Sequence, residues 1–220
     1  MLLISPPFSW MTAPLSGVGW IASALEKIGI KPKIIDCQIT RNYKKKIIES
    51  LKYYSAVGIS STIGTISSAL EIASFIKENS PKTRIIMGGP HPTAVYEKLI
   101  PEYADIIVLG EGEDTMVELM QEEDLSKVKG IAYWDGSLKV NERRPLIEDL
   151  DRLGFPAWHL YDLRRYRYAS RLIPFAMITT SRGCPYNCIY CTKFVHGYKI
   201  RLRSLENVFG EIDYLVNALK

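Results

Sequence analysis

Apolar residues follow two different patterns over the first 120 residues of the chain. Short continuous apolar runs cover residues 1–4, 33–37, 56–60, 84–87 and 105–109, and most of them end beside glycine, serine or proline. Between these runs, apolar side chains recur every three or four positions over residues 18–28, 43–52, 66–76, 93–99 and 113–120. The first pattern is typical of buried strands and the second of amphipathic helices. Strands that alternate with helices predict a parallel sheet covered by helices on both faces.

The predicted fold class is α/β, with a doubly wound, flavodoxin-like sheet of five parallel strands in a domain that spans residues 1–128. Such a sheet has right-handed crossovers and binds its ligand at the carboxyl ends of the strands, beside the switch in strand order. The loops at these ends cover residues 5–16, 60–64, 88–92 and 110–113. Most of them combine glycine with small polar residues, which lets a large ligand approach the backbone. We therefore expect the ligand at this edge of the sheet.

Residues 129–174 are predicted to form a β-hairpin and a linker. Asp135 and Gly136 separate two β-prone runs, which is a strong hairpin signal. Residues 145–163 are rich in turn formers and large aromatic residues. We expect Phe155 and Trp158 to pack where the linker joins the domains on either side of it. Cys37, which ends an apolar run, is expected to act as a small buried hydrophobic residue.

Three cysteines lie close together after the apolar run at residues 175–178. Cys184, Cys188 and Cys191 have the spacing C-x3-C-x2-C. Three thiolates on one loop can hold three irons of a cubane cluster, which leaves a fourth iron open to a small chelating molecule. Two alternatives stay open from the residues alone: a zinc site that adds His196, and thiols without a metal.

The cysteine spacing resembles the signature of the radical S-adenosylmethionine (SAM) enzymes, including the aromatic residue, Tyr190, before the last cysteine. The resemblance implies that Cys184, Cys188 and Cys191 bind a 4Fe-4S cluster and that Tyr190 lies beside the adenine of SAM. It also implies that residues 175–220 are the N-terminal fragment of a (β/α) barrel, with a first strand at 175–178 and a helix capped by Ser204. A full barrel has about 250 residues. We expect this incomplete segment to pack against the first domain, to exchange between chains in self-association, or to lack order.

The first domain resembles the cobalamin-binding domain that precedes the barrel in one class of radical SAM enzymes. The resemblance implies that the loops at the carboxyl edge contact cobalamin. The residues that carry it, or lie in its loops, are Pro6, Pro7, Ser60, Ser61, Thr62, Gly88, Gly89, His91, Pro92, Gly110, Glu111 and Gly112. The chain departs from the cobalamin methyltransferases and mutases, because residues 5–17 contain no histidine for a D-x-H-x-x-G loop. His91 is the alternative imidazole, although it lies between two prolines.

The leading interpretation is the N-terminal part of a cobalamin-dependent radical SAM enzyme. The family would cleave SAM reductively and then transfer a methyl group or form a ring, whereas this chain by itself is expected to be incomplete and inactive. One alternative is a cobalamin-binding module without activity of its own. A weaker one is a dinucleotide-binding oxidoreductase domain, because Gly17, Gly19 and Ala22 match G-x-G-x-x-A and Asp36 ends the next strand. The substrate is not readable from the sequence.

Composition bears on where the protein is located and shows that charge is unevenly distributed along the chain. No apolar run approaches the ~20 residues of a membrane helix, and no basic region precedes the first apolar run, so we expect a cytoplasmic protein. Residues 151–220 hold 11 Lys or Arg against 5 Asp or Glu, a net charge of +6, whereas residues 1–150 hold 17 against 19, or −2. The segment 164–171 interleaves arginine with tyrosine, which suggests either single-stranded nucleic acid or a solvated face with buried aromatic rings. We favour the solvated face.

Overall fold

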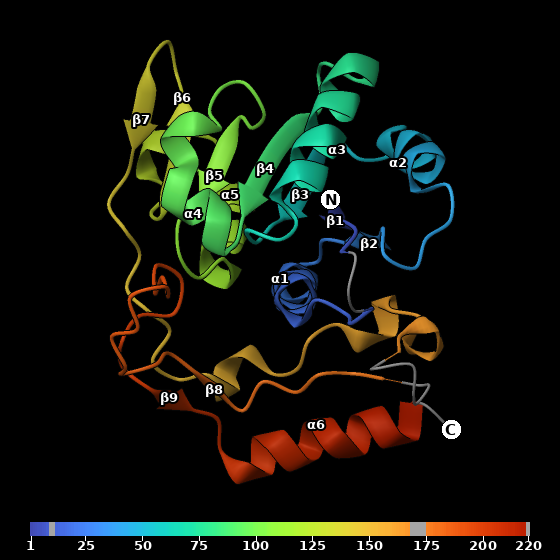
Figure 1. Ribbon diagram of the computed structural model, residues 1–220, viewed down its shortest axis with the longest axis vertical. Helices are drawn as coiled ribbons and strands as arrows, with labels where there is room; N and C mark the ends of the chain where they lie inside the picture. The colour runs from blue at the N-terminus through green and yellow to red at the C-terminus, as the bar shows by residue number, and fades with distance from the viewer. Residues whose placement is uncertain (9–11, 168–174, 219–220) are drawn as a thin grey trace.

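The structure is a computed structural model that describes residues 1–8, 12–167 and 175–218. Its main sheet has seven strands in the order β2-β1-β3-β4-β5-β6-β7 (Figure 1). The first five are parallel: β1 (Leu2–Ser5), β2 (Lys33–Asp36), β3 (Ala56–Ser60), β4 (Arg84–Gly88) and β5 (Ile106–Val108). Because β2 lies on one side of β1 and β3 on the other, the strand order switches at β1 and β3. This is the place where a doubly wound sheet binds its ligand.

The parallel α/β sheet is confirmed, but the prediction of five strands is corrected to seven. The hairpin of β6 (Ile131–Trp134) and β7 (Leu138–Val140) continues the sheet, and β6 pairs antiparallel to β5. The physical reason is that β5 alone would present an unpaired edge of N–H and C=O groups. Ile131, Ala132 and Tyr133 are buried as they cover that edge.

Helices cover both faces of the sheet, as the two patterns of apolar residues predict. On one face, α2 (Tyr43–Leu51) and α3 (Ile66–Asn79) pack with Leu2 and Ile4 of β1 in a core that also contains Cys37. The short helix α4 (Pro90–Val95), which a 3₁₀ turn (Tyr96–Lys98) follows, lies against β4 and β5. On the other face, α1 (Ser16–Lys27) and α5 (Glu113–Gln121) lie beside each other, and Leu3 of β1 packs against α1.

The linker lies between the sheet domain and the last helix, α6 (Leu205–Ala218), as Figure 1 shows. Its 3₁₀ turns are Asp151–Leu153, Trp158–Leu160 and Leu163–Arg165, and another, Leu125–Lys127, precedes the hairpin. Trp158 is 2% exposed and shares a core with Leu215 of α6. The ring centroid of Phe155 lies 6.1 Å from that of Tyr214. Both aromatic residues therefore pack at the junction. Within the single chain, residues 175–218 pack against the linker and the sheet domain, whereas exchange of this segment between chains stays a prediction.

The predicted barrel strand at residues 175–178 is wrong, because residues 175–180 form no strand. Instead, β8 (Ser181–Arg182) pairs antiparallel with β9 (Arg201–Leu202). The first strand of a parallel barrel takes hydrogen bonds from neighbouring barrel strands, and the described residues supply none; the backbone N–H of Phe175 donates to the carbonyl of Leu163. Of the 164–171 segment, residues 168–171 lie outside the described residues, whereas Tyr166 is fully buried. Within the described ranges, no helix has the length and apolar character needed to cross a membrane.

Candidate functional site

A cavity of about 220 Å³ opens at the carboxyl ends of β1, β3, β4 and β5, between the sheet and helices α1 and α5. Its floor is formed by apolar side chains of the strands, including Leu3, Ile86 and Val108. Ile21 of α1 and Met116 of α5 supply apolar walls. We call this cavity the cleft. Its lining is mainly aliphatic, so it suits an apolar part of a ligand.

Glycine keeps the cleft and its rim open. A Cβ atom added to Gly58 would lie 2.8 Å from Leu3 Cδ2, and one added to Gly112 would lie 2.8 Å from Ile21 Cδ1. Gly89 has φ +99°, and a Cβ there would lie 2.6 Å from the carbonyl oxygen of Ser61. Side chains at these positions would collide with the floor, the helix or the neighbouring loop, so the backbone itself borders the space.

The structure divides the residues that the sequence assigned to cobalamin into two groups. Six line the cleft: Ser60, Gly88, Gly89, Gly110, Glu111 and Gly112. The others lie outside its lining: Pro6, Pro7, Ser61, Thr62, His91 and Pro92. Ser61 has a supporting role, because its N–H donates to Gly88 O at 2.9 Å and holds the loop after β3 against the end of β4. Sequence reasoning missed Trp20, Arg182, Val195 and His196, which also line the cleft.

The three cysteines lie on a loop between β8 and β9, residues 183–200, which we call the cysteine loop. The base of the loop is tight: Cys184 N–H donates to Gly197 O at 3.3 Å. Gly183 has φ +88°, and a Cβ there would lie only 2.0 Å from Lys199 O, so only glycine fits. Cys184 is partly buried, whereas Cys188 and Cys191 are exposed; all three are free thiols.

The donor chemistry of the cysteine loop suits a thiolate-ligated cluster, but the thiols are not gathered. Within the described residues, no three His, Cys, Asp or Glu side chains converge in a way that would hold a metal ion. Tyr190 is 87% exposed. His196 does not join the cysteines in the manner of the zinc alternative; its Nδ1 lies 3.1 Å from Glu111 Oε1.

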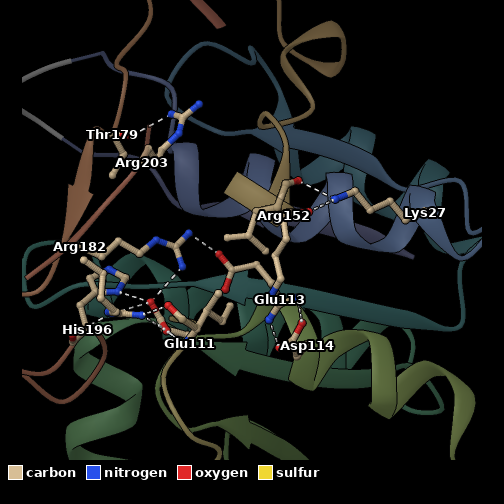
Figure 2. A network of polar contacts seen from close by, with 12 residues as sticks. Lys27, Glu111, Glu113, Asp114, Arg152, Thr179, Arg182, His196 and Arg203 are labelled. Atoms are coloured by element: carbon tan, nitrogen blue, oxygen red, sulfur yellow. Dashed lines mark hydrogen bonds and ion pairs between the residues drawn. The ribbon is translucent and has the colours of Figure 1, made fainter. Parts of the chain in front are cut away.

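Glu111 is the centre of a buried polar network between the sheet domain and the cysteine loop (Figure 2). Arg182 Nη1 donates to its Oε1 at 3.0 Å, and Arg201 Nη1 donates to its Oε2 at 2.8 Å. The backbone N–H of Ile147 also donates to Oε2 at 2.8 Å. The second guanidinium nitrogen of Arg182 reaches Glu113 Oε1 at 2.5 Å. Both carboxylates lie in the loop and first turn that follow β5.

The charges in this network are mutually stabilised. Burial alone would raise the pKa of Glu111, but hydrogen bonds from His196, Arg201 and Ile147 and the charge of Arg182 outweigh it and hold that pKa well below its usual range. Burial tends to lower the pKa of Arg182, whereas Glu113 and Glu111 raise it above its ordinary value. Glu111 is therefore ionised and fully engaged, although the loop that carries it borders the cleft.

A second buried network fixes α6. Trp158 Nε1 donates to Glu211 Oε1 at 2.7 Å, and Arg203 donates to the other oxygen of the same carboxylate. The guanidinium groups of Arg182 and Arg203 lie 5.6 and 5.3 Å from the ring centroid of Trp20 on α1. Trp20 therefore lies close to one guanidinium from β8 and to another just after β9, and cations near an aromatic ring are attracted to it.

The residues of the dinucleotide alternative lie in an unsuitable arrangement. Gly17, Gly19 and Ala22 are inside α1 and not in a tight turn directly after β1. Asp36 is buried, and its carboxylate accepts from Gln38 N at 2.9 Å and from the hydroxyl of Tyr166 at 2.8 Å. A carboxylate in this position is occupied by the chain itself and is not free for a ribose.

Comparison with known proteins gives a consistent picture. Residues 12–120 match the family described as B12 binding domain. An uncharacterized methyltransferase of Pyrococcus horikoshii is 30% identical over 98% of this chain and 50% of its own length. An anaerobic magnesium-protoporphyrin IX monomethyl ester cyclase of Cereibacter sphaeroides is 29% identical over 95% of this chain and 36% of its own length.

Among solved structures, the fold is similar to that of the radical S-adenosylmethionine methyltransferase TsrM from Kitasatospora setae, which was solved with cobalamin and a [4Fe-4S] cluster bound. The TM-score is 0.73 at 17% identity, over 99% of this chain and 46% of TsrM. At this identity the likeness concerns the fold. The chain spans about half, or less, of the length of these proteins.

Proposed function

The chain carries a B12-binding domain and belongs with the cobalamin-dependent radical SAM proteins, and from this premise we propose that it binds cobalamin at the cleft and a 4Fe-4S cluster on the cysteine loop. In this proposal it forms part of an enzyme that cleaves SAM reductively. The observation that carries the proposal is the glycine-bordered cleft at the carboxyl edge of a sheet whose residues match the B12-binding family.

The cleft fits part of a corrinoid and not the whole of it. Pockets for drug-sized ligands have volumes of about 300–1,000 Å³, and the cleft has about 220 Å³. The aromatic base at the end of the nucleotide tail of cobalamin would enter the cleft, where Gly58 and Gly88 add no side chain to the aliphatic floor. The remainder would lie at the rim, against the backbone of Gly89 and Gly110. Bound cobalamin would supply a carrier for a methyl group.

The cluster proposal rests on donor chemistry. Cys184, Cys188 and Cys191 are free thiols on one short loop, and thiolates are the ligands of such clusters. A bound cluster would supply the electron for cleavage of SAM. The exposed ring of Tyr190 is available to lie beside the adenine of SAM, as the resemblance implies. Because the thiols are not gathered without a cluster, we expect the loop to rearrange when the cluster is bound.

Two reaction types are compatible with this assignment. Relatives carry names of both kinds: the Streptomyces wedmorensis cytidylyl-2-hydroxyethylphosphonate methyltransferase is 27% identical over 91% of this chain, whereas the Cereibacter sphaeroides protein is named as a cyclase. Methyl transfer is our first choice and ring formation our second.

The test is cofactor loading under anaerobic conditions. After reconstitution with iron and sulfide, we expect four irons per chain, and absorbance titration with hydroxocobalamin should show saturable binding. Replacement of Cys184, Cys188 and Cys191 with alanine should abolish iron binding and leave cobalamin binding intact, whereas Cys37→Ala, the matched control, should change neither. A chain that binds neither cofactor would refute the proposal.

A cobalamin-binding module without activity of its own is the second candidate. The regular elements of residues 175–218, all of which the structure describes, are β8, β9 and α6. Because these elements are not a set of barrel strands, they favour the module. Assay of the loaded chain for methionine and 5′-deoxyadenosine, the products of SAM cleavage, separates the candidates. Cobalamin binding without SAM cleavage would support the module, and turnover of SAM would exclude it.

A further inference from the structure

One carboxylate contacts both ends of the cysteine loop. Arg182 immediately precedes the loop and Arg201 immediately follows it, and both guanidinium groups donate to Glu111. His196, inside the loop, also lies within hydrogen-bond distance of the same carboxylate. Glu111 itself is 6% exposed and belongs to the loop that leads from β5 into α5. A single buried side chain of the B12-binding domain therefore joins three points on the segment that carries the cysteines.

The same contacts join the cysteine loop to the cleft. Val195 and His196 line the cleft together with Gly110 and Glu111. A ligand held there would touch both the sheet domain and the cysteine loop. The Glu111 carboxylate thus lies where the cysteine loop borders the cleft.

We propose that Glu111 is the positioning residue that sets the cysteine loop over the cleft, by acting through Arg182, Arg201 and His196. The inference rests on the proposed function, in which the cleft holds cobalamin and the loop holds the cluster. In this role Glu111 does not touch either cofactor through its carboxylate. It fixes the spacing between them.

Glu111 is better suited to this role than its neighbour Glu113. Among the residues that the structure describes, Glu113 bonds only Arg182, at the N-terminal end of the loop. Arg201 is 4% exposed, and its contacts apart from Glu111 are the backbone carbonyls of Ile147 and His196. Arg201 Nε is buried without a hydrogen-bond partner among the described residues. Within the described ranges, Glu111 is therefore the one carboxylate that balances the charge of Arg201. Removal of the Glu111 charge leaves a buried, unpaired guanidinium.

The first test needs no cofactor. In Glu111→Gln, hydrogen exchange followed by mass spectrometry should show faster exchange across residues 183–200 by at least about tenfold, because the loop opens locally. Exchange in β1, β3 and β4 should stay unchanged. Unaltered exchange of the cysteine loop would overturn the inference.

Matched variants guard against a general loss of stability. Glu118, on α5, pairs with Arg144. Glu118→Gln is therefore the same chemical change away from the cysteine loop, and it should leave hydrogen exchange of residues 183–200 as in the parent chain. If Glu111→Gln fails to fold, His196→Ala decides, because it removes one partly exposed contact to Glu111. Selective loss of protection in the loop of that variant supports the inference, and full protection overturns it.

The second test measures the spacing itself in the loaded chain. Reduced cluster and cob(II)alamin are both paramagnetic, so pulsed electron paramagnetic resonance reports the distance between them. We expect one narrow distance distribution in the parent chain and in Glu118→Gln, and a broadened or shifted one in Glu111→Gln at equal iron and cobalt content. An unchanged distribution overturns the positioning role. A parent chain that loads neither cofactor refutes the proposed function instead, and hydrogen exchange in Glu111→Gln then decides whether Glu111 holds the loop.

Discussion

The buried carboxylate of Glu211 offers a sharp test of how the C-terminal helix is held. Its side chain is fully buried, and that of its partner Arg203 is 2% exposed. In Glu211→Ala, Arg203 keeps the carbonyl of Thr179 at 2.9 Å and the side-chain oxygen of Asn207 at 2.7 Å, but it loses the negative charge. Trp158 Nε1 also loses its acceptor. The variant therefore leaves a buried cation and a buried indole N–H uncompensated.

The expected cost follows from these losses. Breaking a buried ion pair by removing one partner costs about 3–5 kcal/mol, a large share of the ~5–15 kcal/mol that stabilises a typical domain. With a urea m-value of about 2–3 kcal/mol/M, the unfolding midpoint should fall by roughly 1–2.5 M. Tryptophan fluorescence is a suitable signal because Trp158 lies directly in the network. A separate early transition would mean that α6 detaches before the sheet unfolds.

Two further variants separate charge from packing. Glu206→Ala makes the same change on an exposed position in the first turn of α6 and should cost less than about 1 kcal/mol. The double change of Arg203→Met with Glu211→Leu removes both charges and should recover most of the stability lost in Glu211→Ala, because buried ion pairs are often replaceable by apolar residues. A Glu211→Ala chain within about 1 kcal/mol of the parent would refute the idea that this carboxylate holds α6 in place.

Three more outcomes are expected. The pKa of Glu111 is depressed on folding, so the stability that the ionised carboxylate contributes is present above its unfolded pKa of about 4.3 and is lost as the pH falls toward its folded pKa. Urea midpoints should therefore decline below about pH 5 more steeply in the parent chain than in Glu111→Gln. An equal decline of the urea midpoint with pH in the two chains would contradict this. Burial, with the nearby charge of Asp36, raises the pKa of Cys37 to about 12. Iodoacetamide at pH 8 should consequently spare Cys37 and modify the exposed Cys188, with mass spectrometry as the readout and equal labelling as the contrary result. Gly88→Leu places a side chain in the cleft without backbone strain and should weaken hydroxocobalamin binding by at least about tenfold while iron binding persists; unchanged affinity would exclude the cleft as the site.

Local patterns predicted the elements of the sheet domain well, because burial and periodicity act over a few residues. Strand β3 has the predicted bounds, Ala56–Ser60, and the others differ by a residue or two at their ends. The hairpin turn at Asp135 and Gly136 was also readable. Its pairing with β5 was not, because edge pairing depends on which strand is left exposed after the whole sheet has assembled.

The candidate site was predicted in position but not in detail. Strand order and loop composition placed Gly88 and Gly110 at the cleft, since carboxyl ends of parallel strands meet at one edge. The sequence did not predict what Glu111 binds, because Arg182 and Arg201 lie 71 and 90 residues away along the chain. Spacing predicted the donor chemistry of the cysteines, whereas their separation depends on the conformation of the loop.

The uneven charge of the chain has a structural explanation in these networks. Residues 151–220 carry a net charge of +6, which by itself suggests a surface for phosphates or nucleic acid. Arg182, Arg201 and Arg203 are all buried, and each bonds a carboxylate of the chain. Two of them bond carboxylates in the more acidic first 150 residues. Part of the basic character therefore serves to join the cysteine-bearing segment to the B12-binding domain, and a bound polyanion would have to break buried ion pairs to reach these arginines.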